Sequence, residues 1–302
     1  MLEVSIGIPA YNEEANIGRL LKTLLGQKLR QVKIREIIVV ASGCIDKTVE
    51  IVKGFQKKEK RIKLFVQRQR LGKNAANNLF FKKAKSNTLV LVCADILLKK
   101  DCLENLIRPF LDPKVGIAAA RMIPLNKKDN IPGYFSHLWW RLWHRVASKF
   151  FRAGELLAFR RVVRSIPKEI GADEVFLTDE IFAKGYKGRY VPRAIGYNMG
   201  PQTIGDIIRI RRRHACLHLE FRDSGPKAYY PKTMDNFYVF RLFLKEVNWN
   251  SPREAIFATL CLILEGASRI LAYYDFYSGN KNYQAWLRSE STKKLPVFKN
   301  FK

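Results

Sequence analysis

Four short motifs carry the side chains in this sequence that are best suited to binding a phosphorylated ligand and to acid–base chemistry. They are, in order, Pro9-Ala10-Tyr11-Asn12-Glu13-Glu14, Ala41-Ser42-Gly43-Cys44-Ile45-Asp46, Cys93-Ala94-Asp95 and Ala172-Asp173-Glu174. Each lies just after an apolar run or in a loop near one, which is where an open α/β sheet binds its ligand. The motifs therefore predict one shared cleft.

Asp95 follows the apolar run Leu89-Val90-Leu91-Val92, so it is expected where a buried strand ends. A carboxylate there can hold a divalent cation that bridges two phosphates and stabilises a departing nucleoside diphosphate. The alternative is an Asp that caps the next segment. No Gly-rich phosphate loop of either common type is present, so a diphosphate would need a metal ion or basic side chains. Lys73 and Asn77, at the start of an expected helix, suit a phosphate, although a solvated basic turn has the same pattern.

Short apolar runs alternate with helical patterns in the first third of the chain. Val4–Ile8, Ile37–Val40, Leu64–Val66 and Leu89–Val92 predict buried strands, because they are short, rich in β-branched residues and bounded by polar segments. A helical repeat from Ile17 to Leu25 lies between the first two. Right-handed crossovers in such a βαβ series bring the carboxyl ends of the strands to one edge of a parallel sheet.

The first two motifs also fit ordinary local structure. Pro9 to Glu14 fits a strand end followed by acidic residues at a helix N-terminus, and Asp46 fits a helix N-cap.

Taken together, these motifs resemble a family 2 glycosyltransferase with the GT-A fold, from about Val4 to about Leu219. The resemblance implies an α/β fold in which a mostly parallel central sheet has helices on both faces. It also implies a nucleotide-sugar donor. The residues assigned to the donor are Pro9, Ala10, Tyr11, Asn12, Glu13, Ser42, Asp46, Lys73, Asn77, Ala94, Asp95, Arg212 and Arg213.

Two motifs depart from the usual family pattern. Ala41 and Ser42 stand in place of paired acids, as in a subset with an Ala-Ser-Gly-Cys second loop. Cys93 replaces the first acid of Asp-x-Asp, which leaves Asp95 as the predicted ligand of Mg or Mn.

The second half of the predicted site lies on the acceptor side. Gly154 and Glu155 begin a segment that resembles the acceptor-side strand of the family. The pair Asp173-Glu174 matches its acidic motif in reversed order. By register Glu174 takes the place of the catalytic base, and the adjacent Asp173 is the other candidate. A base is needed because a sugar hydroxyl is a weak nucleophile.

A basic run from Arg209 to His214 matches the segment that contacts the diphosphate and acceptor in the family. Arg212 and Arg213 are expected to stabilise the leaving group, because guanidinium groups bind phosphate through fixed pairs of donors. His214 is assigned to the acceptor side. His214 and His218 also have the spacing of metal ligands on a helix, but without a third ligand packing or acceptor contact is the preferred interpretation.

The 302-residue chain has 55 Lys and Arg against 27 Asp and Glu, a formal charge of +28. This excess indicates an anionic partner: nucleic acid, an acidic membrane surface or a phosphorylated substrate. No recognised nucleic-acid module is present, so no specific nucleic acid is predicted.

Five scattered cysteines favour reduced thiols, and the N-terminus has no signal-peptide pattern. A location in the cytoplasm, at the cytoplasmic face of the cell membrane, is expected.

Two apolar stretches bear on membrane attachment. Phe135 to Phe150 forms a basic, aromatic amphipathic helix that either lies in a membrane interface or covers the protein's own core. The run Ala255–Leu264 is interrupted by Glu265 and Arg269, which favours interfacial or re-entrant attachment to anionic lipid over a full span. We expect a glycosyltransferase domain over residues 1–230 and a helical, membrane-associated extension over 231–302.

The sequence thus predicts an inverting glycosyltransferase. The expected donor is a nucleotide sugar, and the resemblance to the family implies that the nucleotide is UDP. The expected acceptor is a polysaccharide or lipid-linked glycan. The alternatives are a membrane-attached protein that keeps the fold without catalysis, and a basic nucleic-acid-binding protein.

Overall fold

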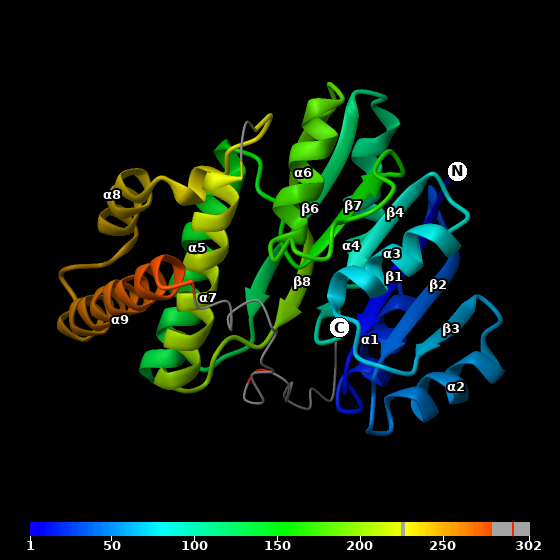
Figure 1. Ribbon diagram of the computed structural model, residues 1–302, viewed down its shortest axis with the longest axis horizontal. Coiled ribbons are helices and arrows are strands. Elements are labelled where there is room, and N and C mark those ends of the chain that lie inside the picture. The colour runs from blue at the N-terminus through cyan, green and yellow to red at the C-terminus, as the bar shows by residue number, and fades with distance from the viewer. Residues whose placement is uncertain (225–226, 280–291, 293–302) are drawn as a thin grey trace.

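A computed structural model describes residues 1–224, 227–279 and 292 of the chain. The described residues form an eight-stranded sheet in the order β3-β2-β1-β4-β7-β6-β8-β5 (Figure 1). The strands are β1 (Leu2–Ala10), β2 (Val32–Ser42), β3 (Ile62–Gln67), β4 (Thr88–Val92), β5 (Leu97–Leu98), β6 (Val115–Pro124), β7 (Leu156–Arg160) and β8 (Lys187–Asn198). The α-helices are α1 (Ile17–Leu25), α2 (Thr48–Lys58), α3 (Lys73–Lys83), α4 (Cys102–Ile107), α5 (Ile131–Lys149), α6 (Asp173–Ala183), α7 (Ile204–Asp223), α8 (Asn236–Glu246) and α9 (Pro252–Tyr277). Two 3₁₀ helices, η1 (Arg108–Leu111) and η2 (Lys232–Met234), complete the described elements.

The predicted mostly parallel α/β sheet is confirmed. Strand β1 pairs in parallel with β2 and β4, and β2 with β3. Strand β7 runs antiparallel between β4 and β6, and β6 pairs in parallel with β8. Each of the four predicted strands lies within one of β1 to β4. The carboxyl ends of β1, β2 and β4 therefore lie at one edge, as the motif positions require.

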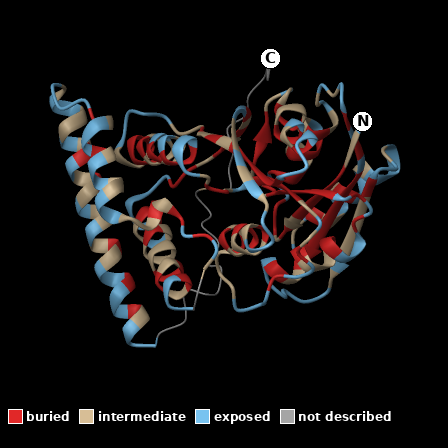
Figure 2. Cartoon of the chain, turned by 90° about the horizontal axis from the view of Figure 1, so that it is seen from above, coloured by how far each residue is buried: buried red, intermediate tan, exposed pale blue. Residues whose placement is uncertain are grey.

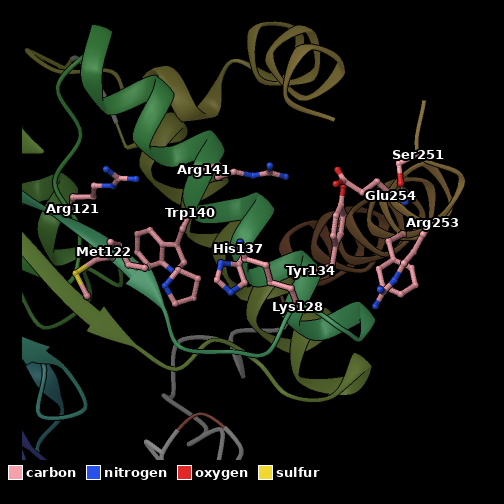
Figure 3. Close-up of a pocket in the computed structure, with 13 residues that line it drawn as sticks. Arg121, Met122, Lys128, Tyr134, His137, Trp140, Arg141, Ser251, Arg253 and Glu254 are labelled. Carbon is pink, nitrogen blue, oxygen red and sulfur yellow. Dashed lines mark hydrogen bonds between the residues drawn. The ribbon is translucent and has the colours of Figure 1, made fainter. Parts of the chain in front are cut away.

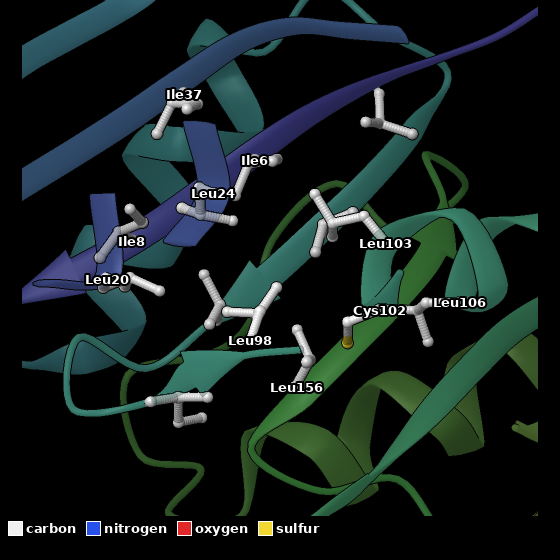
Figure 4. Packing of buried hydrophobic residues seen from close by; sticks show 14 of the residues in the cluster. Ile6, Ile8, Leu20, Leu24, Ile37, Leu98, Cys102, Leu103, Leu106 and Leu156 are labelled. Atoms are coloured by element: carbon white, nitrogen blue, oxygen red, sulfur yellow. The ribbon is translucent and has the colours of Figure 1, made fainter. Parts of the chain in front are cut away.

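Apolar side chains alternate between the two faces of the sheet. On one face Leu20 and Leu24 of α1 pack with Ile6 and Ile8 of β1 (Figure 4). The other face is covered by α3 and α6, through side chains such as Phe80. Because neighbouring residues of a strand point to opposite faces, a strand with apolar residues throughout is buried on both. Figure 2 shows these buried residues concentrated in the sheet and the helices beside it.

Helices α5, α7, α8 and α9 lie beside the sheet (Figure 1). The apolar face of α5 is buried: Phe135, Leu138 and Leu142 pack in one cluster with residues of α7, α8 and α9. Of the two interpretations of this helix, the structure supports the one in which it covers the protein's own core.

Helix α9 packs along α7 and is long and apolar enough, by length and composition, to cross a membrane. It is the one helix of the described segments that meets this test. The boundary at residue 230 stays a prediction, and the proposed extension runs beyond the described residues.

Candidate active site

The predicted acidic pair lies in the first turn of α6, and Asp173 is anchored by α3. Lys73 Nζ donates to Asp173 Oδ1 at 2.8 Å, and Asn77 Nδ2 donates to Asp173 Oδ2 at 3.2 Å. Lys73 is the first residue of α3 and Asn77 follows one turn later, so both point the same way. Both oxygens of the buried Asp173 are thus occupied, and the structure joins Lys73, Asn77 and Asp173, which the motifs predicted separately.

Glu174 has a different environment from Asp173. Its Oε1 lies 3.5 Å from a guanidinium nitrogen of Arg152, a side chain that is 3% exposed. Burial and the neighbouring charge of Asp173 raise the pKa of Glu174, while Arg152 and Lys73 oppose that rise. A carboxylate with a raised pKa is better matched to accepting a proton near neutral pH than an ordinary one.

Asp95 comes from the end of β4, beside the start of the acceptor-side strand. The backbone N–H of Cys93 donates to the Glu155 carbonyl at 3.4 Å, and Glu155 Oε2 accepts from Asn198 at 2.7 Å. Burial raises the pKa of the Cys93 thiol, opposed by Lys73, and the charges of Asp95, Glu155 and Asp173 add to the rise. Cys93 therefore stays protonated, and these predicted residues share one neighbourhood.

The donor-side loops after β1 and β2 are joined by hydrogen bonds. The N–H of Glu13 donates to Thr48 Oγ1 at 2.7 Å, and Asn12 Oδ1 accepts from the N–H of Ile45 at 2.9 Å. Asn12 has a φ of 51°, a left-handed conformation that asparagine tolerates better than most residues.

Asp46 contacts both the start of α2 and the other donor-side loop. Its Oδ1 accepts from the Thr48 N–H at the start of α2, and its Oδ2 accepts from the Glu14 N–H, each at 3.0 Å. The N-cap position of α2 is therefore Lys47 and not Asp46, as the local interpretation had it, but Asp46 still accepts from the first N–H of the helix.

Tyr11 and Ser42 form the outer part of this region together with the loop after β3. The guanidinium of Arg70 lies 4.2 Å from the centre of the Tyr11 ring, and Ser42 Oγ accepts from the Leu71 N–H at 3.1 Å. Gly43 has a φ of 64°, and a Cβ added to it would lie 2.6 Å from the backbone nitrogen of Arg70. Only glycine fits this close approach of the two loops without strain.

The three consecutive arginines of α7 have three different partners. Arg211 donates to both oxygens of Glu265, and Arg212 donates to both oxygens of Asp275, all on α9. Arg213 is the one near the acidic pair: burial lowers its pKa to about 10, and the charges of Asp173 and Glu174 oppose that shift. Arg212 is thus held at α9, and because successive helix residues point about 100° apart, Arg213 points elsewhere. The expected contact of Arg212 with the diphosphate stays a prediction.

His214 and His218 lie mainly among arginines, and Glu265 is the acidic residue near His218. Burial lowers the pKa of His214 well below its usual value and that of His218 to about 3, and Arg211 and Arg152 reinforce both shifts. Both rings are therefore neutral in a cationic setting. No group of three or more His, Cys, Asp or Glu residues within the described ranges could by itself hold a metal ion. The packing interpretation is favoured over a histidine metal site.

Asp95 fits a cation only if the donor supplies most of the ligands. Mg²⁺ is commonly bound through one or two carboxylates together with substrate phosphates, so a single carboxylate beside a diphosphate is a suitable donor set. Cys93 adds no charge there, because its pKa is raised.

Two residues of this site have no counterpart among the sequence predictions. Arg152 lies beyond the end of α5 at Lys149, in the following loop, with its guanidinium 4.6 Å from the centre of a Trp143 ring. Arg70 belongs to none of the motifs. The contact of each depends on tertiary packing, and no local pattern signals it.

Comparison with known proteins gives a consistent result. The family model described as Glycosyl transferase family 2 matches residues 5–158, just over half of the chain. The probable glycosyltransferase YdaM of Bacillus subtilis is 27% identical over 224 residues, 67% of this chain and 51% of that protein. The poly-beta-1,6-N-acetyl-D-glucosamine synthase of Staphylococcus aureus is 24% identical over 221 residues, 69% of this chain and 52% of that protein. The chain thus spans about half the length of these curated relatives.

Among solved structures, a mannosyltransferase from Pyrobaculum calidifontis in complex with GDP-Man and Mn²⁺ aligns with a TM-score of 0.60. The identity is 22%, and the alignment covers 94% of this chain and 82% of that one. This likeness shows the fold, which is of the GT-A glycosyltransferase type.

Proposed function

Because the chain belongs to glycosyl transferase family 2, we propose that it is an inverting glycosyltransferase that uses a nucleotide-sugar donor, preferably a UDP-sugar. The acceptor in this proposal is a polysaccharide or a lipid-linked glycan. The observation that carries it is the acidic pair of α6, held by Lys73 and next to Arg213, in the same neighbourhood as Asp95. A carboxylate can remove the proton of the acceptor hydroxyl, and cations can stabilise the departing diphosphate, so the two kinds of group are needed side by side.

The two acids have different roles in this mechanism. Glu174 is the base, because its raised pKa suits proton transfer from the acceptor hydroxyl as that oxygen attacks the anomeric carbon. Asp173 is a positioning residue, because both of its oxygens accept hydrogen bonds from α3. The sequence left both acids as candidates, and their hydrogen bonding favours Glu174.

Departure of the nucleoside diphosphate needs positive charge at the phosphate oxygens. Lys73 stays charged, since Asp173 and Glu174 hold its pKa above the usual value against the effect of burial. Arg213 supplies a guanidinium group from α7. Asp95 would hold Mg²⁺ or Mn²⁺, which when bound neutralises charge on the leaving group.

Calorimetric titration of UDP, GDP and their sugars, with and without Mn²⁺, tests the donor site on the intact chain and on Asp95→Ala. The expected result is metal-dependent binding of one nucleotide family that Asp95→Ala weakens at least tenfold. The matched control is Asp101→Ala, an acid close by in the sequence that lies at the start of α4. No donor binding by a folded chain would reject the proposal, and donor binding without hydrolysis or transfer to any of several glycan acceptors, under varied metals, would favour the non-catalytic alternative.

We also place the enzyme at an anionic membrane surface, through the outward face of α9. Ile256, Ile263 and Ile270 recur every seven residues on that face and are exposed, and Tyr274 and Tyr277 continue it. In the middle and last part of α9, Glu265 and Asp275 point inward to α7, where they pair with Arg211 and Arg212. An outward apolar face is typical of a helix that contacts lipid.

Helix α8 supplies charge next to this face. Its exposed residues combine Phe237, Phe240 and Leu244 with Arg241 and Lys245. Basic residues near an anionic bilayer each contribute about 1 kcal/mol.

Sedimentation with vesicles containing phosphatidylserine tests the membrane proposal. The triple change Ile256→Ser, Ile263→Ser and Ile270→Ser should lower the bound fraction several-fold. Ile45→Ser, at an exposed isoleucine on the donor-side loop, should not. Equal binding of the triple variant and the unchanged chain would reject attachment through α9.

A further inference from the structure

A cavity separate from the predicted donor site lies between the end of β6, the first half of α5 and the start of α9 (Figure 3). Its volume is about 610 Å³, within the range of small-molecule sites. None of the residues assigned to the donor, metal or base lines it. We call it the α5–α9 pocket.

The α5–α9 pocket is strongly basic. Four cations line it, Arg121, Lys128, Arg141 and Arg253, against one carboxylate, Glu254. None of the four forms an ion pair with a residue of the described segments, whereas nearby Arg145 pairs with Glu246. Cations gathered in a cavity without acidic partners favour a multiply charged anion, and guanidinium groups favour phosphate.

A buried hydroxyl in this pocket lies beside one of the four cations. Tyr134 is 7% exposed, and burial raises the pKa of its hydroxyl, with Glu254 adding to the rise and Arg141 opposing it. Arg141 is close enough to interact with the hydroxyl, but no described residue gives it a hydrogen bond of normal geometry. A buried polar group without a hydrogen bond costs about 1–3 kcal/mol, so such groups are usually satisfied by a ligand or by water. The Nε2–H of His137, also in the wall, donates to the Asn126 carbonyl at 2.8 Å, and burial lowers the pKa of the ring, so His137 adds no charge.

The rest of the wall is apolar and aromatic. An inorganic anion would make no use of this apolar surface, whereas a ligand with an apolar part would contact it. Met122, Trp140 and Phe257 line the cavity together with the basic groups. Phe257 is on the same turn of α9 as Ile256, which faces outward with 59% of its surface exposed. The pocket thus adjoins the outward apolar face of α9.

We propose that the α5–α9 pocket binds the phosphomonoester head of an anionic lipid, with the four cations and the Tyr134 hydroxyl contacting the phosphate and the aromatic wall contacting the apolar body. This binding does not depend on the sugar-transfer reaction. Trp140 lies 5.6 Å from Trp143, centre to centre, so occupation of the pocket is expected to change tryptophan fluorescence.

The test is a fluorescence and calorimetric titration of the full chain with three probes. These are inorganic phosphate, dihexanoyl phosphatidate and dihexanoyl phosphatidylcholine, each below its micelle concentration. Saturable binding of the phosphatidate, at least tenfold tighter than that of phosphate and absent for the phosphatidylcholine, is expected. Equal binding of phosphate and phosphatidate would overturn the lipid assignment and identify a site for a soluble phosphate.

Variants separate a built site from general attraction to a basic protein. Arg141→Gln combined with Lys128→Gln should weaken phosphatidate binding at least tenfold, and Tyr134→Phe should weaken it without loss of stability. The charge-matched control changes Lys53 and Lys57 of α2 to Gln and should alter affinity less than twofold.

An equal loss in the control, or no saturable binding, would overturn the proposal. Donor binding measured on the same variants should be unchanged, so failure here is distinguishable from failure of the proposed transferase function.

Discussion

Helices α5 and α9 are both long and rich in apolar residues, but α5 buries an apolar face against the protein and α9 buries charged side chains. In α5 the apolar side chains Leu138 and Leu142 are buried, and Arg141 is exposed. In α9 the charged Glu265 and Asp275 face inward, while Ile263 is 60% exposed. The difference arises because α7 presents Arg211 and Arg212 to α9, so the neighbour, and not the apolar content, decides which face is buried.

Removing a buried apolar side chain of α5 should have the largest effect on stability. Leu138 is 3% exposed, so Leu138→Ala is expected to lower the free energy of unfolding by about 3 kcal/mol, from lost burial and the cavity that remains. Urea unfolding measures it. An effect below about 1 kcal/mol would mean that this face is not the packed one.

Breaking the inward-facing ion pair between Arg211 of α7 and Glu265 of α9 should have the second-largest effect on the free energy of unfolding. Arg211 is 3% exposed and holds both oxygens of Glu265, so Arg211→Met is expected to cost about 2–3 kcal/mol; Arg269 still pairs with Glu265 and moderates the loss. Arg222→Met, in an exposed pair with Asp223 on the same helix, should cost less than about 0.5 kcal/mol. Equal losses in the two variants would show that the inward pair does not hold α9.

The smallest effect is expected on the outward face of α9. Ile263→Ala should change the free energy of unfolding by less than about 0.5 kcal/mol, because the side chain is mostly exposed. Measured beside Leu138→Ala, it compares two aliphatic truncations on the two helices. A loss as large as that of Leu138→Ala would contradict the proposed lipid-facing surface.

The sequence predicted the parts of the structure that depend on local pattern. Strands β1 to β4 follow from short β-branched runs, and the positions of Asp95 and Asp173 follow from motif order. The sequence did not predict which neighbour each helix side chain contacts, because that depends on how the helices pack. Arg212 and Arg213 are adjacent and alike in type, yet one binds α9 and the other lies beside the acidic pair.

Long-range contacts account for the rest of what the sequence left open. The outward face of α9 could not be predicted without knowing that α7 lies against it. Arg152 could not be assigned to Glu174, because 22 residues and a strand separate them. The α5–α9 pocket joins three segments that no motif links.

The central claim is that Glu174 is the base of a glycosyl transfer and Asp173 positions Lys73. The most direct measurement is the rate of nucleoside diphosphate release as the sugar passes from the bound donor to a glycan hydroxyl or to water, for Glu174→Gln and Asp173→Asn, with donor affinity measured on each. We expect Glu174→Gln to lower the release rate by about 10²-fold or more with donor affinity unchanged, since that is the usual contribution of a general base. Asp173→Asn should weaken donor binding as well as the rate. A Glu174→Gln protein that releases product as fast as the unchanged chain would contradict the account.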